Sequence, residues 1–151
     1  MEIAVFREES RMSKIAIASL LSGLIAQAMK VFIEFVRTGK LHLPTFFNTG
    51  GMPSSHTSLV TTLTIGVGLE SGIGSSVFSV TLIFSLYFIF EATGLRQEVG
   101  KQARVLNELV DELIAKHQLN RTRLKELVGH TWKEVFVGLL VGTAVAYGAF
   151  F

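Results

Sequence analysis

The transition from turn to helix that organises this chain reads Gly50-Gly51-Met52-Pro53-Ser54-Ser55-His56 and runs directly into the apolar segment 57–69. A Gly-Gly pair allows a sharp bend and a close approach of the backbone to a ligand. Pro53 suits the first position of a helix, and the two serines would add hydroxyl groups beside the unpaired N–H groups of the helix start. Such a start favours a bound anion, within reach of His56. A capped turn that opens a membrane helix is the other interpretation, and the motif alone leaves both open.

The composition is that of a membrane protein. Of the 151 residues, 49% are apolar and only 17% are charged, and the mean hydropathy is +0.48. A chain of this length is expected to form one domain, residues 1–151. The absence of cysteine excludes disulfides, thiolate metal sites and cysteine nucleophiles. Residues 1–13 lack the cleavage pattern of a removable signal peptide.

Four apolar segments are predicted to cross the membrane, residues 14–36, 57–69, 75–92 and 134–151. The first is long enough, because about 20 helical residues cross the hydrocarbon core. The second is short for a span, so we expect it to be tilted or shielded by protein. The last carries small residues that permit close helix packing in lipid, namely Gly138, Gly142, Ala144, Ala146 and Gly148. The expected fold class is therefore all-α, a polytopic membrane helical bundle with about four spans.

A polar segment, residues 93–133, separates the last two spans. Six apolar residues and one histidine recur in it at helical spacing, which predicts an amphipathic helix over 98–118; they are Val99, Ala103, Leu106, Val110, Leu113, Ile114 and His117. A shorter helix is predicted over 122–128. The sequence does not decide whether these helices lie on the membrane surface or cap the bundle.

The distribution of positive charge predicts an orientation. Four spans would put both termini on one side of the membrane and the loops 37–55 and 93–133 on the other. These loops carry most of the lysine and arginine residues, so the positive-inside rule places them in the cytoplasm. Their charge could instead serve an anionic substrate.

Three polar groups fall on the face that bears these loops. They are Lys30 and Arg37 at the end of the first span, Ser54, Ser55 and His56 in the turn, and His130 and Glu134 at the start of the last span. The first pair is seven residues apart, two helical turns, and therefore lies near one helix face. The last pair is four residues apart, so its side chains are neighbours.

These groups resemble the three motifs of the type 2 phosphatidic acid phosphatase and vanadium-dependent haloperoxidase superfamily. The matching patterns are Lys30-x6-Arg37, Pro53-Ser54-Ser55-His56 and His130-x3-Glu134-x3-Gly138. The resemblance to the small divergent membrane branch of that superfamily is closer and covers most of the chain from Lys30 onward. It is carried by Gly50-Gly51-Met52-Pro53-Ser54-Ser55-His56, Gly94-Leu95-Arg96-x4-Lys101-Gln102-Ala103 and Gly129-His130-Thr131-x2-Glu134-Val135.

Four positions depart from the superfamily pattern. Thr38 stands where the superfamily usually has proline, Ser55 where it has glycine, and Glu134 where it has aspartate. Leu124 stands where it has arginine, so another cation would have to supply that charge. The candidates are Arg96, Lys101, Arg123 and Lys125.

The resemblance implies a membrane-embedded, acid-phosphatase-like phosphoric ester hydrolase that cleaves a phosphomonoester or diphosphate, such as a lipid phosphate, through a phosphohistidine intermediate. His130 would be the nucleophile, Glu134 its orienting partner, and His56 the acid that protonates the leaving oxygen. This chemistry is self-consistent, because an imidazole attacks only when neutral and a neighbouring carboxylate fixes its tautomer. A second histidine must be protonated to donate.

Phosphate binding is expected from cations and from groups at the turn, namely Lys30, Arg37, Gly51, Ser54, Ser55, Arg96 and Lys101. Neither a metal nor a cofactor is needed for this chemistry. The expected partners are membrane lipid and a phosphorylated lipid substrate, and no nucleic acid. The short second span and the glycine-rich fourth span leave a homodimer open.

Each group also has a purely structural interpretation. Lys30 could pair with Glu34, four residues on, which would offset the cost of burying a charge in the membrane. His130 and Glu134 could form a cap at the helix start, and the loop cations could contact lipid head groups. The alternative function is then a non-catalytic membrane protein that retains a phosphate pocket, with a vanadate-binding oxidase as a more distant one. The phosphatase is preferred because independent structural roles do not require all these groups to share one face.

Overall fold

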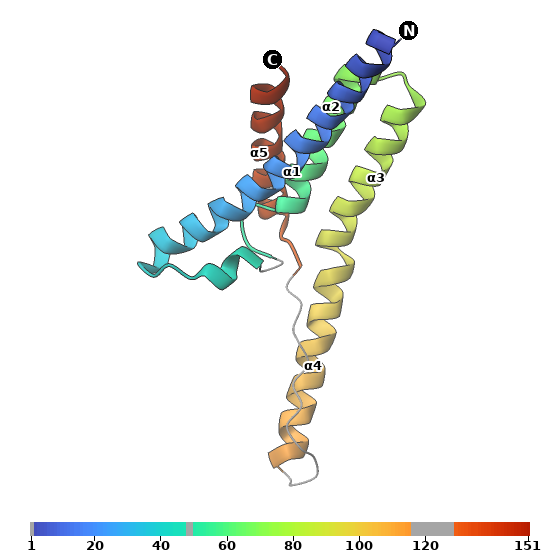
Figure 1. The fold of residues 1–151 in the computed structure, drawn as a ribbon. Helices are drawn as coiled ribbons and strands as arrows, with labels where there is room; N and C mark the ends of the chain where they lie inside the picture. Colours follow the sequence, from blue (N-terminus) through green and yellow to red (C-terminus); the bar gives the residue numbers. More distant parts are fainter. Residues whose placement is uncertain (1, 48–49, 116–128) are drawn as a thin grey trace.

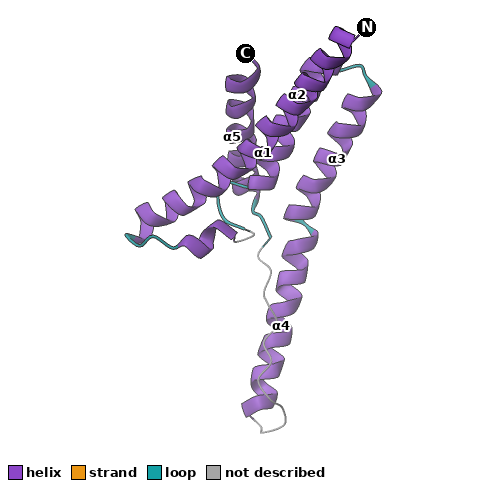
Figure 2. Cartoon of the chain, in the orientation of Figure 1, coloured by secondary structure: helices purple, strands orange, loops and turns teal. Residues whose placement is uncertain are grey.

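The computed structural model describes residues 2–47, 50–115 and 129–151, with side chains described for all of these except 2–13, 95–97 and 115. The described residues form helices and no strands (Figures 1 and 2). In chain order they are α1 (Glu2–Thr38), the 3₁₀ helix η1 (Leu43–Phe47), α2 (Ser55–Ser71), α3 (Ser76–Thr93), α4 (Leu95–Ala115) and α5 (Trp132–Phe150). The predicted all-α membrane bundle is confirmed.

Helix α2 lies at the centre of the bundle and packs against α1, α5 and α3. Its contact with α1 is made by small polar residues, where the hydroxyl oxygens of Ser22 and Ser58 are 2.6 Å apart. On the α5 side, the hydroxyl of Thr62 donates a hydrogen bond of 2.9 Å to the carbonyl of Gly142. Small side chains let helix backbones approach closely, and hydroxyl groups then bond across the contact.

The small residues of the last span divide between two faces of α5. Gly138, Gly142 and Ala146 are buried, whereas Ala144 and Gly148 are exposed. A Cβ atom at Gly142 would lie 2.5 Å from the carbonyl oxygen of Ser58, closer than real Cβ atoms come. The predicted close packing is therefore confirmed for Gly138 and Gly142, which contact α2, and Ala146 is buried as well.

Three described stretches are long and apolar enough to cross a membrane, which are Lys14–Thr38, Ser76–Ile114 and Trp132–Phe150. Helix α2 has 17 residues, which at about 1.5 Å per residue is short of the ~30 Å hydrocarbon core. The expectation of about four spans is thus confirmed for three. As predicted for the short segment, α2 is shielded by protein, because α1 and α5 cover it.

The amphipathic helix begins earlier than predicted. It starts at Leu95 instead of residue 98, because the chain resumes helical hydrogen bonding directly after Gly94, whose carbonyl accepts from the N–H of Glu98 at 3.1 Å. Helix α4 continues the course of α3 away from the other helices (Figure 1) and contacts only α3 among the described elements, so its described part does not cap the bundle. The predicted end at residue 118 and the predicted helix over 122–128 lie outside the described residues.

The start of α2 also differs from the prediction. Ser54 is the N-cap residue, and its hydroxyl oxygen accepts a hydrogen bond of 3.3 Å from the N–H of Thr57. Pro53 therefore precedes the cap and does not occupy the first helical position, which belongs to Ser55. The physical reason is that a serine side chain satisfies an unpaired N–H group of the first turn, which proline cannot do.

Candidate functional site

The histidine at the start of α5 is held by a carboxylate. Nδ1 of His130 lies 2.8 Å from Oε2 of Glu134. An ionised carboxylate only accepts hydrogen bonds, so Nδ1 carries the proton and Nε2 of a neutral ring carries the lone pair. The ring is 2% exposed, and the backbone N–H of His130 donates to the carbonyl of Ala92 at 2.9 Å, which ties it to the end of α3.

The same carboxylate caps α5. Thr131 is the N-cap residue, and its backbone N–H donates to Oε2 of Glu134 at 3.3 Å. In return, the N–H of Glu134 donates to the hydroxyl oxygen of Thr131 at 3.4 Å. This capping box satisfies two unpaired donors of the helix start. The same oxygen atom, Oε2 of Glu134, therefore holds the ring of His130 and caps the start of α5.

The second histidine approaches the first from α2. The ring centroids of His56 and His130 are 6.4 Å apart, with an angle of 61° between the ring planes. The backbone N–H of Ser54 donates to the carbonyl of Glu134 at 3.0 Å. The starts of α2 and α5 are thus joined directly, and this contact sets the spacing of the two histidines.

A buried cation from α1 completes the group. Lys30 is 4% exposed, and the carboxylate of Glu134 attracts its ammonium group. Its stem passes the turn, because a Cβ atom at Gly51 would lie 4.0 Å from Cδ of Lys30. Gly51 has φ +84°, a conformation that favours glycine. No ion pair between Lys30 and Glu34 occurs among the described residues, so the contacts favour a position of the Lys30 side chain beside the turn at Gly51.

The two serines have different surroundings. Ser54 is fully buried, and its hydroxyl oxygen accepts from Thr57 twice, from the backbone N–H and from the side-chain hydroxyl at 3.0 Å. Ser55 is buried beside His56 in the wall of a groove. Capping is therefore the observed role of Ser54, whereas Ser55 lines the groove beside His56.

Three predicted phosphate-binding cations are not brought to this group by any described contact. Arg37 is exposed in the last turn of α1, at the end of the helix that points away from α2 and α5 (Figure 1). Nζ of Lys101 lies 2.6 Å from Oε1 of Glu98, and both side chains are exposed. The side chain of Arg96 is outside the described part of the chain, as are Arg123, Leu124 and Lys125.

A groove of about 340 Å³ runs from His56 between α1 and α2. It is lined by Leu20, Gly23, Leu24, Gln27, Ser55, His56 and Leu59. Gln27 is not among the residues that the sequence motifs single out. The signal that could have identified it is its spacing, because a polar residue three positions before Lys30 lies on the same side of the helix.

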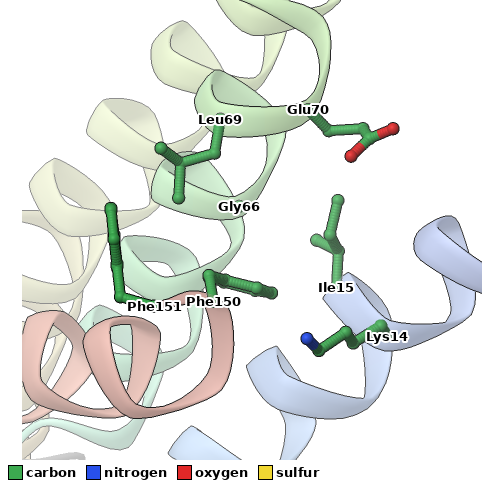
Figure 3. A pocket seen from close by; sticks show the side chains of 7 residues that line it. All are labelled: Lys14, Ile15, Gly66, Leu69, Glu70, Phe150 and Phe151. Atoms are coloured by element: carbon green, nitrogen blue, oxygen red, sulfur yellow. The ribbon is translucent and has the colours of Figure 1, made fainter.

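A second cavity, of about 310 Å³, lies at the opposite end of α2 and α5 (Figure 3). It is lined by Lys14, Ile15, Gly66, Leu69, Glu70, Phe150 and Phe151. Nζ of Lys14 lies 5.9 Å from the centroid of the Phe150 ring. This cavity lacks histidine and holds a carboxylate as well as an ammonium group, so it is not the candidate phosphate site.

Comparison with known proteins identifies the family of this chain. A family described as the divergent PAP2 family matches residues 12–145. A relative, the uncharacterized membrane protein YuiD of Bacillus subtilis (strain 168), is 42% identical over 83% of this chain and 87% of its own length. No solved structure matches the chain. The family match covers most of α1, all of α2 and α3 and most of α5, and the chain therefore belongs to the divergent PAP2 family.

Proposed function

We propose that this protein is a membrane-embedded phosphatase that hydrolyses a lipid phosphate, as a phosphomonoester or diphosphate, through a phosphohistidine at His130. The observation that carries the proposal is the hydrogen bond from His130 to Glu134 with the ring of His56 6.4 Å away. In-line transfer needs roughly 3–3.5 Å between the attacking atom and phosphorus and a hydrogen bond to the leaving oxygen on the far side. The phosphorus–oxygen bond and the ring radii add to these distances, so an in-line phosphoryl group between the two nitrogens needs ring centroids more than 6.4 Å apart, and we expect the two rings to separate when substrate binds.

The reaction would proceed in two steps, transfer of the phosphoryl group to His130 and hydrolysis of the phosphohistidine. Nε2 of neutral His130 attacks phosphorus, and the bond from phosphorus to the leaving oxygen breaks as His56 gives that oxygen its proton. The leaving alcohol departs and His130 carries the phosphoryl group. His56, now neutral, takes a proton from water, whose oxygen attacks the phosphohistidine and releases inorganic phosphate.

Charge stabilisation would come mainly from Lys30 and from the turn. The phosphoryl oxygens gain negative charge in the transition state, and a buried ammonium group acts strongly on them because little water screens it. Glu134 would stabilise the positive charge that develops on His130. The membrane location of α1 and α5 favours a lipid substrate, since both helices are long and apolar enough to span.

The test is phosphate release from lipid phosphates by the purified protein in lipid nanodiscs. His130→Ala is compared with His42→Ala, which removes an exposed histidine of the loop before η1. We expect release by the wild type and by His42→Ala and none by His130→Ala. Equal release by His130→Ala would overturn the nucleophile assignment. Tight binding of lipid phosphates without release by the wild type would identify the non-catalytic alternative.

A further inference from the structure

The groove between α1 and α2 connects His56 with the lipid-facing side of α1. Leu20 and Leu24 line it and are 60% and 52% exposed, within a stretch long and apolar enough to span the membrane. Leu59 of α2 lines the opposite wall, and His56 lies among the lining residues. An apolar groove that opens toward lipid and reaches a phosphate site suits a hydrocarbon chain joined to a phosphate.

One buried polar atom in this groove's lining has no hydrogen-bond partner among the described residues. Nε2 of Gln27 donates a hydrogen bond of 2.7 Å to the carbonyl of Phe46, which fixes which end of the amide is nitrogen. The other end, Oε1, is buried, and no described residue bonds to it. A buried acceptor without a donor is costly and rare, so Oε1 is suited to accept a hydrogen bond from a bound molecule.

Three residues of α1, Gly23, Gln27 and Lys30, follow one another in the same order as the hydrocarbon chain, the linking group and the phosphate of a lipid phosphate. Gly23 lies in the groove, Gln27 follows about 6 Å along the helix axis, and Lys30 follows about 4.5 Å further. A chain beside Gly23 and a phosphate beside Lys30 would place the group that links them at Gln27. The hydrogen-bond donor of that group would stand two or three bonds from the phosphate ester.

We infer that the groove between α1 and α2 binds the hydrocarbon chain of the substrate, and that Oε1 of Gln27 accepts a hydrogen bond from a hydroxyl or amide N–H group next to the phosphate. This inference rests on the proposed function and narrows its substrate class. Lipid phosphates with such a donor, on a glycerol or a long-chain amino alcohol, are preferred. Prenyl phosphates, which have no donor there, are disfavoured.

The donor is tested with two substrates that differ in one oxygen atom. These are a monoacyl glycerol 3-phosphate with a free 2-hydroxyl group and its 2-deoxy analogue with the same chain. We expect the wild type to prefer the first by roughly tenfold in kcat/KM, as for a buried acceptor that loses its partner. Gln27→Met keeps an unbranched side chain of similar length without the amide and should bring this ratio close to one. A wild-type ratio near one, or an unchanged ratio in the variant, overturns the role of Gln27.

The chain groove is tested by filling it. A Cβ atom at Gly23 would lie 3.4 Å from Cδ1 of Leu59, so Gly23→Leu would occupy the groove. The matched control is Gly148→Leu, because nothing lies within 4 Å of a Cβ atom at that position. We expect Gly23→Leu to lower kcat/KM for a long-chain lipid phosphate by at least roughly tenfold relative to a small aryl phosphate, and the control to leave that ratio unchanged. Equal loss for both substrates, or no loss, overturns the groove assignment.

Binding separates this inference from the proposed function. Non-hydrolysable phosphonates of the hydroxyl and deoxy lipids are titrated into the wild type and Gln27→Met by calorimetry in nanodiscs. If no phosphate ester is cleaved but the wild type prefers the hydroxyl phosphonate, the phosphatase proposal fails and the role of Gln27 stands. If esters are cleaved and the phosphonates bind equally, the role of Gln27 fails and the phosphatase proposal stands.

Discussion

Replacing Gly138 by alanine should damage both packing and catalysis, because this glycine touches the cap of α2. A Cβ atom there would lie 2.6 Å from the carbonyl oxygen of Ser54 and 2.9 Å from Cβ of Thr57. Real Cβ atoms essentially never come within 3.0 Å of such neighbours. The first contact is with backbone, which cannot rotate away, so α2 and α5 must separate at their starts. Overpacking of this kind costs about 1–3 kcal/mol.

The assay compares Gly138→Ala with Gly148→Ala, where the added Cβ has no neighbour within 4 Å. At roughly 2–4 °C per kcal/mol for a chain of this size, we expect the midpoint of thermal unfolding in detergent to fall by about 2–12 °C for Gly138→Ala. Gly148→Ala should be neutral or slightly stabilising, since alanine favours helix. Phosphatase activity below the unfolding midpoint should also fall in Gly138→Ala, because the bond from Ser54 to Glu134 sets the spacing of the histidines. Equal midpoints for the two variants would refute the close contact.

Three further predictions concern the chemistry. His130→Ala should lower the initial rate of phosphate release by at least about a thousandfold, and Glu134→Gln by roughly a hundredfold, because an orienting group contributes less than the reacting atom. The reverse order of the two rates would show that the roles are wrongly assigned. The pH profile of kcat/KM should be bell-shaped, since one histidine must be neutral and the other protonated. His56→Ala should remove the limb of the profile that is due to the acid, and should lower the hydrolysis of lipid phosphates more than that of activated aryl phosphates. A monotonic profile that His56→Ala leaves unchanged would contradict the pairing. Arg96→Ala should raise the vanadate inhibition constant and lower turnover, because Lys30 alone does not neutralise three phosphoryl oxygens. The control Arg121→Ala should change neither quantity, and an unchanged inhibition constant in Arg96→Ala would favour the interpretation that Arg96 contacts lipid head groups.

The helices were largely predictable because apolar length is a local property. The third span was predicted over 75–92 and is found as Ser76–Thr93, and the last was predicted over 134–151 and is found as Trp132–Phe150. The start of α4 was not predictable in the same way. Gly94 reads as a break, yet its carbonyl accepts the first hydrogen bond of the next helix, so the chain continues instead of turning.

The site was predictable where its residues are neighbours on one helix and less so where distant segments meet. The contact of His130 with Glu134 follows from their spacing on one helix turn. Lys30 and Arg37 share a helix face, but α1 continues past the bundle, so only Lys30 reaches the turn. Gln27 was missed because its importance depends on the carbonyl of Phe46, whose position follows from η1 and not from any pattern in the first span.

The glutamate at position 134 offers a last test, since the superfamily resemblance leads one to expect aspartate there. Oε2 of Glu134 accepts from Nδ1 of His130 at 2.8 Å and from the N–H of Thr131 at 3.3 Å. A capping box favours glutamate or glutamine at this position, because the side chain must reach back to the N-cap residue. Aspartate is one methylene shorter, so Glu134→Asp keeps the charge and should lose one of the two bonds. We expect the bond from the N–H of Thr131 to be lost while the N–H of residue 134 still donates to the Thr131 hydroxyl, at a cost of about 0.5–1.5 kcal/mol in unfolding free energy, with activity closer to wild type than in Glu134→Gln. Lower activity in Glu134→Asp than in Glu134→Gln would mean that reach, and not charge, is what His130 requires from this residue.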